Sequence, residues 1–90
     1  MKTEFKQSFA ADLSNIHDST LRSRLKRMIE SIEEKNRLPA MDKLVTANSG
    51  EDYYALKLED YWVGLKVLAA QVIFVRILHN KEITQYFLGD

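Results

Sequence analysis

The sequence predicts a single α+β domain, residues 1–90, in which an N-terminal helical hairpin packs on a small antiparallel β-sheet. In the first half of the 90-residue chain, apolar residues recur at helical spacing, and in the second half they alternate with polar ones. The gaps between the alternating runs are too short to hold crossover helices, so neighbouring strands must run antiparallel. Ninety residues suffice for one domain with a small core.

The first helix is expected around residues 5–16. Its apolar residues recur at spacings of four, four and three, which places them on one helical face: Phe5, Phe9, Leu13 and Ile16. The polar residues of this segment, Asp12 among them, then fall elsewhere on the surface. This pattern predicts a helix with one face against the core.

A second helix follows the polar cluster at residues 18–20. Short side-chain oxygens of this kind accept hydrogen bonds from the first amides of a helix, so the cluster suits an N-cap. The apolar positions behind it share one face: Leu21, Leu25, Met28, Ile29 and Ile32. The helix is expected to end within residues 36–39, since Pro39, the only proline of the chain, cannot continue it.

Three strands are expected at residues 53–58, 61–68 and 72–78, where apolar residues alternate or β-branched residues dominate. The gaps between them are short, which predicts an antiparallel meander. A tail, residues 79–90, follows with three candidate anchors in the core: Ile83, Tyr86 and Phe87.

Composition excludes several classes of protein. Hydrophobic residues at 46% and charged residues at 29% argue against disorder. The absence of cysteine excludes disulfides and thiolate chemistry and fits a reducing compartment. The longest apolar run, residues 67–75, is too short for a membrane helix, and no signal peptide is visible, so we expect a cytoplasmic protein. Thirteen basic and thirteen acidic residues give no net charge, which argues against a protein that binds nucleic acid mainly through overall positive charge.

The usual catalytic motifs are missing. The three glycines are scattered, so no phosphate-binding loop is present. The two histidines lie far apart, which argues against a zinc site and a serine triad, and no metal is expected. His17 falls in a polar turn, where we interpret it as solvated. His79 ends the last predicted strand and is a candidate for function, with a packing role as the alternative.

A basic block crowds the N-terminal half of the second helix: Arg22, Arg24, Lys26 and Arg27. It opposes the helix dipole, which favours acidic residues there. The block therefore indicates an acidic partner or a phosphate backbone. The alternative is a solvated face on which pairs such as Lys26 and Glu30 offset part of the cost.

Three stretches resemble the RelE/ParE toxin superfamily. They are the opening of the first helix (residues 5–13), the last strand with its ending (residues 72–83), and the run Tyr-Tyr-Ala-Leu-Lys-Leu-Glu-Asp-Tyr-Trp-Val-Gly at residues 53–64. The resemblance implies a bacterial toxin of a type II toxin–antitoxin pair, with a cognate antitoxin as partner. RelE-like members enter the ribosome and cut mRNA through attack by the RNA 2′-hydroxyl, without a metal or other cofactor.

The resemblance also suggests roles for individual residues. As catalytic groups it suggests Lys57, Lys81 and His79; as RNA-binding groups Trp62, Lys66 and Arg76; and as antitoxin-binding groups Arg22, Arg24, Lys26 and Arg27. Strand alternation places Lys57 and Trp62 on the face away from the core, together with Ala55 and Gly64. The same alternation gives Arg76 the phase of Phe74. For Trp62, stacking on a base and plain packing remain alternatives, and for Lys57 and Lys81 a solvated position does.

The chain departs from the family at several basic positions. Where many relatives have arginine it has Ala55, Trp62, Asn80 and Gln85, and where they have glycine before the second strand it has Glu59. Three functions therefore stay open. The first is a RelE-like endonuclease weakened by the loss of basic residues. The second is a ParE-like inhibitor of DNA gyrase, and the third is a non-catalytic toxin that only binds its antitoxin.

Overall fold

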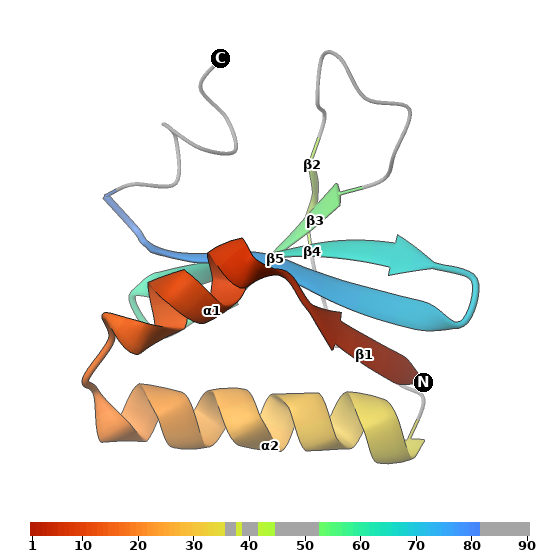
Figure 1. The fold of residues 1–90 in the computed structure, drawn as a ribbon, viewed down its shortest axis with the longest axis horizontal. Helices are drawn as coiled ribbons and strands as arrows, with labels where there is room; N and C mark the ends of the chain where they lie inside the picture. Colours follow the sequence, from red (N-terminus) through yellow and green to blue (C-terminus); the bar gives the residue numbers. More distant parts are fainter. Residues whose placement is uncertain (36–37, 39–41, 45–52, 82–90) are drawn as a thin grey trace.

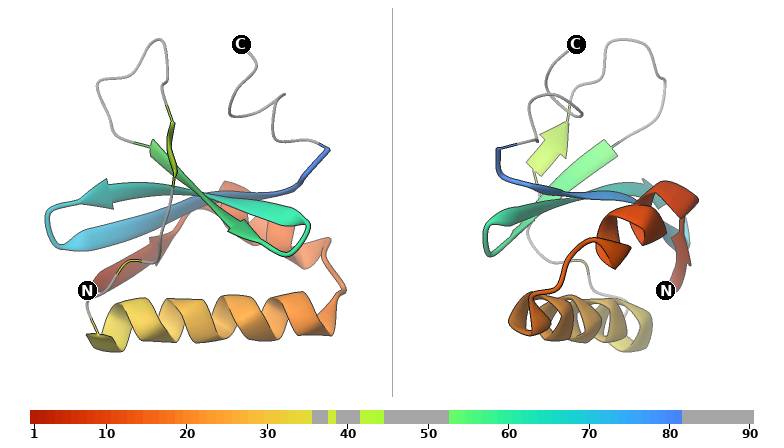
Figure 2. Two further views of the ribbon diagram at one scale, coloured as in Figure 1. Left: turned by 180° about the vertical axis from the view of Figure 1, so that it is seen from behind. Right: turned by 60° about the vertical axis from the view of Figure 1, so that its left-hand side comes forward.

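A computed structural model describes residues 1–35, 38, 42–44 and 53–81. Its two helices lie on the same side of a mixed sheet (Figures 1 and 2). Within the described residues the sheet has five strands in the order β1-β5-β4-β3-β2. The elements are β1 (Lys2–Phe5), α1 (Gln7–Ser14), α2 (Ser19–Lys35), β2 (Asp42–Leu44), β3 (Tyr53–Leu58), β4 (Tyr61–Leu68) and β5 (Gln71–His79). The α+β prediction, with helices on one face of a small sheet, is confirmed.

The predicted meander is present. Strands β3, β4 and β5 pair antiparallel in sequence order, with residues 59–60 and 69–70 as two-residue turns. The sheet is larger than predicted, however, because β2 pairs antiparallel with β3 and β1 pairs parallel with β5, where Lys2 lies opposite Gln71. A parallel partner is not foreseeable from local alternation, since the pairing joins opposite ends of the chain.

The prediction that Phe5 begins the first helix is wrong. Phe5 is the last residue of β1, Lys6 is extended with φ −72° and ψ 156°, and α1 begins at Gln7. The phenyl ring of Phe5 nevertheless lies 5.7 Å from that of Phe9 and 5.1 Å from that of Phe74. A strand that leads directly into a helix thus brings apolar residues together at a spacing that resembles helical periodicity.

Helix α2 begins as the sequence predicts. The Oδ1 atom of Asp18 accepts hydrogen bonds from the backbone amides of Thr20 at 3.0 Å and Leu21 at 3.1 Å, an N-cap that satisfies two orphan donors. Helix α2 runs to Lys35. The predicted end around Pro39, and the tail anchors Ile83, Tyr86 and Phe87, lie outside the described residues. Among the described residues, no helix is long and apolar enough to cross a membrane.

The main core lies between the helices and the sheet. Its buried members come from both helices, the α1–α2 connection and three strands: Phe9, Ile16, Leu21, Leu25, Ile32, Leu56, Val63, Leu65, Val72, Phe74 and Ile77. Three other buried apolar residues, Ala55, Ile73 and Leu78, do not belong to this cluster. The core fixes which face of each strand points to the helices.

A bulge in β5 changes the phase of the sheet. Gly64 pairs with Arg76, but the next residue of β4, Leu65, pairs with Phe74, so Val75 is left without a partner in the β4–β5 pairing. The expectation that Arg76 shares the phase of Phe74 is therefore wrong. Phe74 points to the helices, whereas Arg76 leaves the strand on the side of Gly64.

Candidate functional site

The face of the sheet opposite the helices carries basic and aromatic side chains in cross-strand pairs. Lys57 of β3 lies opposite Trp62 of β4, and its Nζ atom is 6.0 Å from the centre of the Trp62 ring. Tyr53 and Lys66 form a second pair, with Nζ 5.8 Å from the tyrosine ring centre. Ala55 and Gly64 lie between the two pairs. We call this surface, which neither helix covers (Figure 1), the open face. Its four predicted residues lie on it as strand alternation predicts, but only Lys57 is exposed: Trp62 is half-buried, and Ala55 and Gly64 are buried.

Trp62 is fixed by a neighbouring strand end. Its indole Nε1 donates a 2.7 Å hydrogen bond to Oδ1 of Asn80, and the Asn80 backbone amide donates to the carbonyl of Asp60, also at 2.7 Å. The β3–β4 turn that contains Asp60 is in turn held by an ion pair of 2.8 Å between Glu59 and Arg24 of α2. Glu59 adopts φ 58°, a left-handed conformation that favours glycine.

His79 belongs to another environment. It is the cross-strand partner of Tyr61, and the two rings meet edge-on with their centres 5.2 Å apart. Its Nδ1 accepts a hydrogen bond of 3.2 Å from the backbone amide of Lys81. Tyr61 shares the phase of Val63 and packs against the core, opposite to Trp62. The structure therefore does not bring His79 and Lys57 together on one face. Lys81 is exposed just beyond the end of β5.

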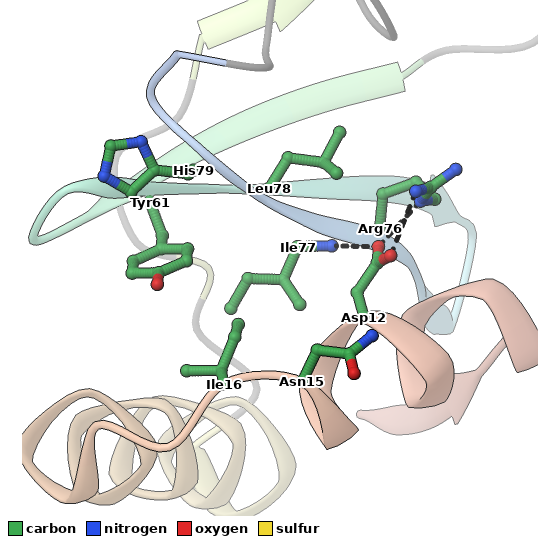
Figure 3. A pocket seen from close by; sticks show the side chains of 8 residues that line it. All are labelled: Asp12, Asn15, Ile16, Tyr61, Arg76, Ile77, Leu78 and His79. Atoms are coloured by element: carbon green, nitrogen blue, oxygen red, sulfur yellow. Dashed lines mark hydrogen bonds and ion pairs between the residues drawn. The ribbon is translucent and has the colours of Figure 1, made fainter.

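Arg76 is bound by Asp12 of α1 (Figure 3). The Asp12 carboxylate accepts hydrogen bonds from Arg76 Nε at 2.6 Å, from an Arg76 terminal nitrogen at 2.9 Å, and from the Ile77 amide at 3.1 Å. This contact lies where β1 ends, so the carboxylate takes the place of a strand partner along β5. It borders a cavity of about 190 Å³ lined by Asp12, Asn15, Ile16, Tyr61, Arg76, Ile77, Leu78 and His79.

The role of Asp12 differs from the general surface position that the sequence predicts for it. Its position three residues after Phe9 places it beside the buried face of α1, and it lies in a stretch that resembles the toxin superfamily. Local spacing cannot identify Arg76 as the partner of Asp12, since the two residues are 64 positions apart.

The basic block of α2 divides into two parts. Arg22 donates hydrogen bonds of 2.8 Å to the carbonyls of Leu13 and Ile16, which caps the end of α1, and Arg24 pairs with Glu59. Lys26 and Arg27 are exposed and form no ion pair with any residue of the described ranges. Between α1 and α2 lies a largely apolar groove of about 320 Å³, lined by Leu13, Arg22, Leu25, Lys26, Ile29 and Glu30.

Residues 3–84 match the model of a family described as the ParE toxin of the type II toxin–antitoxin system parDE. The chain belongs to this family of type II toxins. It is 32% identical over 88 residues to Toxin RelE3 of Methanocaldococcus jannaschii, covering 97% of this chain and 99% of that protein. The RelE/ParE resemblance and the function as the toxin of a type II module are thereby confirmed.

Solved structures of toxin–antitoxin complexes share the fold. The RelB–RelE complex from Methanococcus jannaschii contains a chain 30% identical to this toxin, with a TM-score of 0.74 and coverage of 93% of this chain and 98% of that one. In the DinJ–YafQ complex of E. coli the matching chain has a TM-score of 0.65 and coverage of 91% and 96%, but only 17% identity, so it supports the fold alone. Across the described residues, no group of three or more histidine, aspartate or glutamate side chains is placed to hold a metal ion.

Proposed function

We propose that this toxin is a RelE-like, ribosome-dependent mRNA endonuclease that inhibits translation in the cytoplasm. The observation that carries the proposal is the open face, where the exposed Lys57 lies beside Trp62 on a surface that neither helix covers. The similarity to RelE toxins over almost the whole chain supports it.

The reaction needs no cofactor. The 2′-oxygen of one ribose forms a bond to the adjacent phosphorus, the bond to the 5′-oxygen of the next nucleotide breaks, and a 2′,3′-cyclic phosphate and a 5′-hydroxyl result. Lys57 accepts the 2′-hydroxyl proton or contacts the phosphate, and Lys81 neutralises the charge that develops on the phosphorane. A proton must also reach the departing 5′-oxygen, and we propose that the Lys81 ammonium donates it. His79 stays the third proposed catalytic group, although it lies on the other face of the sheet from Lys57. Its bond with the Lys81 amide additionally fixes the backbone of that lysine.

Binding of the RNA strand is proposed to involve the rest of the open face. Trp62 offers a ring on which a base can stack. Lys66 lies two residues after Gly64 on the same face of β4 and offers a cation for the RNA backbone. Arg76 stays a predicted RNA contact, although its guanidinium already bonds to Asp12.

The test is to induce the protein in cells and map mRNA ends on translating ribosomes. We expect cuts within translated codons and growth arrest for the wild type, and the loss of both for Lys57→Ala. Lys35→Ala is the matched control, since Lys35 is an exposed lysine at the end of α2, on the helical side of the molecule. Intact transcripts and normal growth with the wild-type protein would refute the proposal.

A second candidate, inhibition of DNA gyrase, is favoured by the ParE family model and by the absence of arginine at Ala55, Trp62 and Asn80. It predicts that purified toxin blocks supercoiling of plasmid DNA while mRNA stays intact. The third hypothesis, a toxin that only binds its antitoxin, predicts neither effect. The two assays together therefore separate the three functions.

A cognate antitoxin is the proposed partner, as in the RelB–RelE and DinJ–YafQ complexes. We propose that an acidic antitoxin segment meets the basic block, chiefly Lys26 and Arg27, because Arg22 and Arg24 already bind groups of this chain. Replacing Lys26 and Arg27 by glutamate should raise the dissociation constant at low salt, with Lys35→Glu as control. An unchanged dissociation constant would exclude this surface.

A further inference from the structure

We propose that Asn80 is a positioning residue that fixes the indole of Trp62 as a stacking surface for one base of single-stranded RNA. The inference rests on the proposed RNA endonuclease function and assigns the recognition of a nucleobase to a specific pair of residues.

The indole is held from outside its own strand. A tryptophan on an open strand surface can rotate about two side-chain torsions, but Nε1 of Trp62 is bonded to Asn80 at 2.7 Å, which selects one orientation. Asn80 itself is anchored through its backbone amide to Asp60, in the turn between β3 and β4. Both partners of the bond thus lie at the paired ends of neighbouring strands, β4 and β5.

The turn also contacts the helical layer through an exposed ion pair. Glu59, next to Asp60, pairs with Arg24 of α2 at 2.8 Å. A chain of contacts therefore leads from α2 through the β3–β4 turn to Asn80 and on to Trp62. A fixed ring costs little conformational entropy when a ligand binds, which is the property that a stacking surface requires.

The surroundings of the ring suit RNA in particular. Trp62 is half-buried, and the Lys57 ammonium lies over one face of its ring, 6.0 Å from the ring centre, so a base would stack on the other face. A base on the ring and its phosphate at the ammonium would be engaged together, as in single-strand binding sites that combine aromatic side chains with basic ones. The proposed scissile phosphate would then lie next to the stacked nucleotide, which couples base recognition to cleavage.

Trp62 is the only tryptophan in the chain, so its fluorescence reports directly on the indole. Asn80→Ala should shift the emission of the free protein and increase its quenching by acrylamide. On translating ribosomes the same variant should cleave mRNA about three- to tenfold more slowly, the range expected for one lost hydrogen bond. Asn15→Ala is the matched control, because Asn15 is an exposed asparagine whose amide bonds only to Ala11 of its own helix end.

A double-mutant cycle shows whether Asn80 acts through Trp62. Trp62→Phe keeps an aromatic ring but lacks the Nε1 donor, so Asn80→Ala should have no further effect on cleavage in that background. Equal losses in both backgrounds would overturn the proposal, because Asn80 would then contact the RNA itself. Wild-type emission and cleavage in Asn80→Ala would overturn it too.

A failure of the endonuclease proposal can be distinguished from a failure of the stacking surface. If the wild type cleaves no mRNA, that proposal fails, and quenching of Trp62 fluorescence by single-stranded oligoadenylate still decides whether a base stacks on the indole. Quenching that is weakened in Asn80→Ala supports the stacking surface. An absence of quenching with the wild type would overturn it.

Discussion

Replacing Asp12 by alanine should destabilise the protein far more than its position on an exposed helix suggests. Its side chain is 14% exposed and accepts three hydrogen bonds, two from Arg76 and one from the Ile77 amide. The substitution leaves the Ile77 amide and the guanidinium without this acceptor at the edge of β5.

The magnitude follows from these contacts. An orphaned backbone amide costs about 1–3 kcal/mol, and loss of a paired, partly exposed charge adds about 1 kcal/mol. We therefore expect Asp12→Ala to lower the free energy of unfolding by about 2–4 kcal/mol. For a domain of this size, each kcal/mol lowers Tm by about 4–8 °C, so Tm should fall by roughly 8–32 °C.

Urea and thermal unfolding, followed by the fluorescence of Trp62, measure this effect. Asp12→Asn keeps an oxygen for the Ile77 amide and should lose about half as much. Glu4→Ala is the control, because Glu4 is an exposed acid and should change stability by less than about 0.5 kcal/mol. An Asp12→Ala protein that unfolds within the error of Glu4→Ala would refute the reasoning.

Three further substitutions test contacts described above. Asp18→Ala removes the N-cap of α2 and should cost about 1 kcal/mol in urea unfolding, whereas Asp18→Ser should be nearly neutral. Arg22→Ala exposes the uncapped carbonyls at the end of α1, and we expect a loss of about 1–2 kcal/mol, since a bond to a charged donor is worth about this much. Glu59→Gly relieves the left-handed backbone at the cost of an exposed ion pair, and it should raise the free energy of unfolding by up to about 1 kcal/mol; a lower Tm would contradict this.

The parts of the fold that follow from local pattern were predictable. The apolar face of α2 and its cap at Asp18 depend on neighbours within a few residues, and so do the two-residue turns of the meander. Strand β1 depends instead on a partner strand about 70 positions away, so no residue near Phe5 predicts it. The three-residue β2 is too short to produce a recognisable alternation.

The candidate site was predictable to the same extent. Alternation along β3 and β4 correctly placed Lys57 and Trp62 on one face, because neither strand is interrupted there. The bulge at Val75 shifted the phase of Arg76, and no residue type in β5 signals a bulge. The side of the sheet on which His79 lies follows from its register with Tyr61, which only the paired structure provides.

The pairing of β1 with β5 has a consequence for the timing of synthesis. Lys2 cannot pair until Gln71 has been synthesised. In the same way, the Phe9 ring cannot pack until the Phe74 ring is present, whose centre lies 5.4 Å from its own. At about 5–20 residues per second, several seconds pass between the two ends of each contact. A nascent chain that stops before β5 lacks the strand that joins β1 to β4, and its core is incomplete. We therefore expect incomplete translation products of this toxin to be inert, so that only a finished chain requires neutralisation.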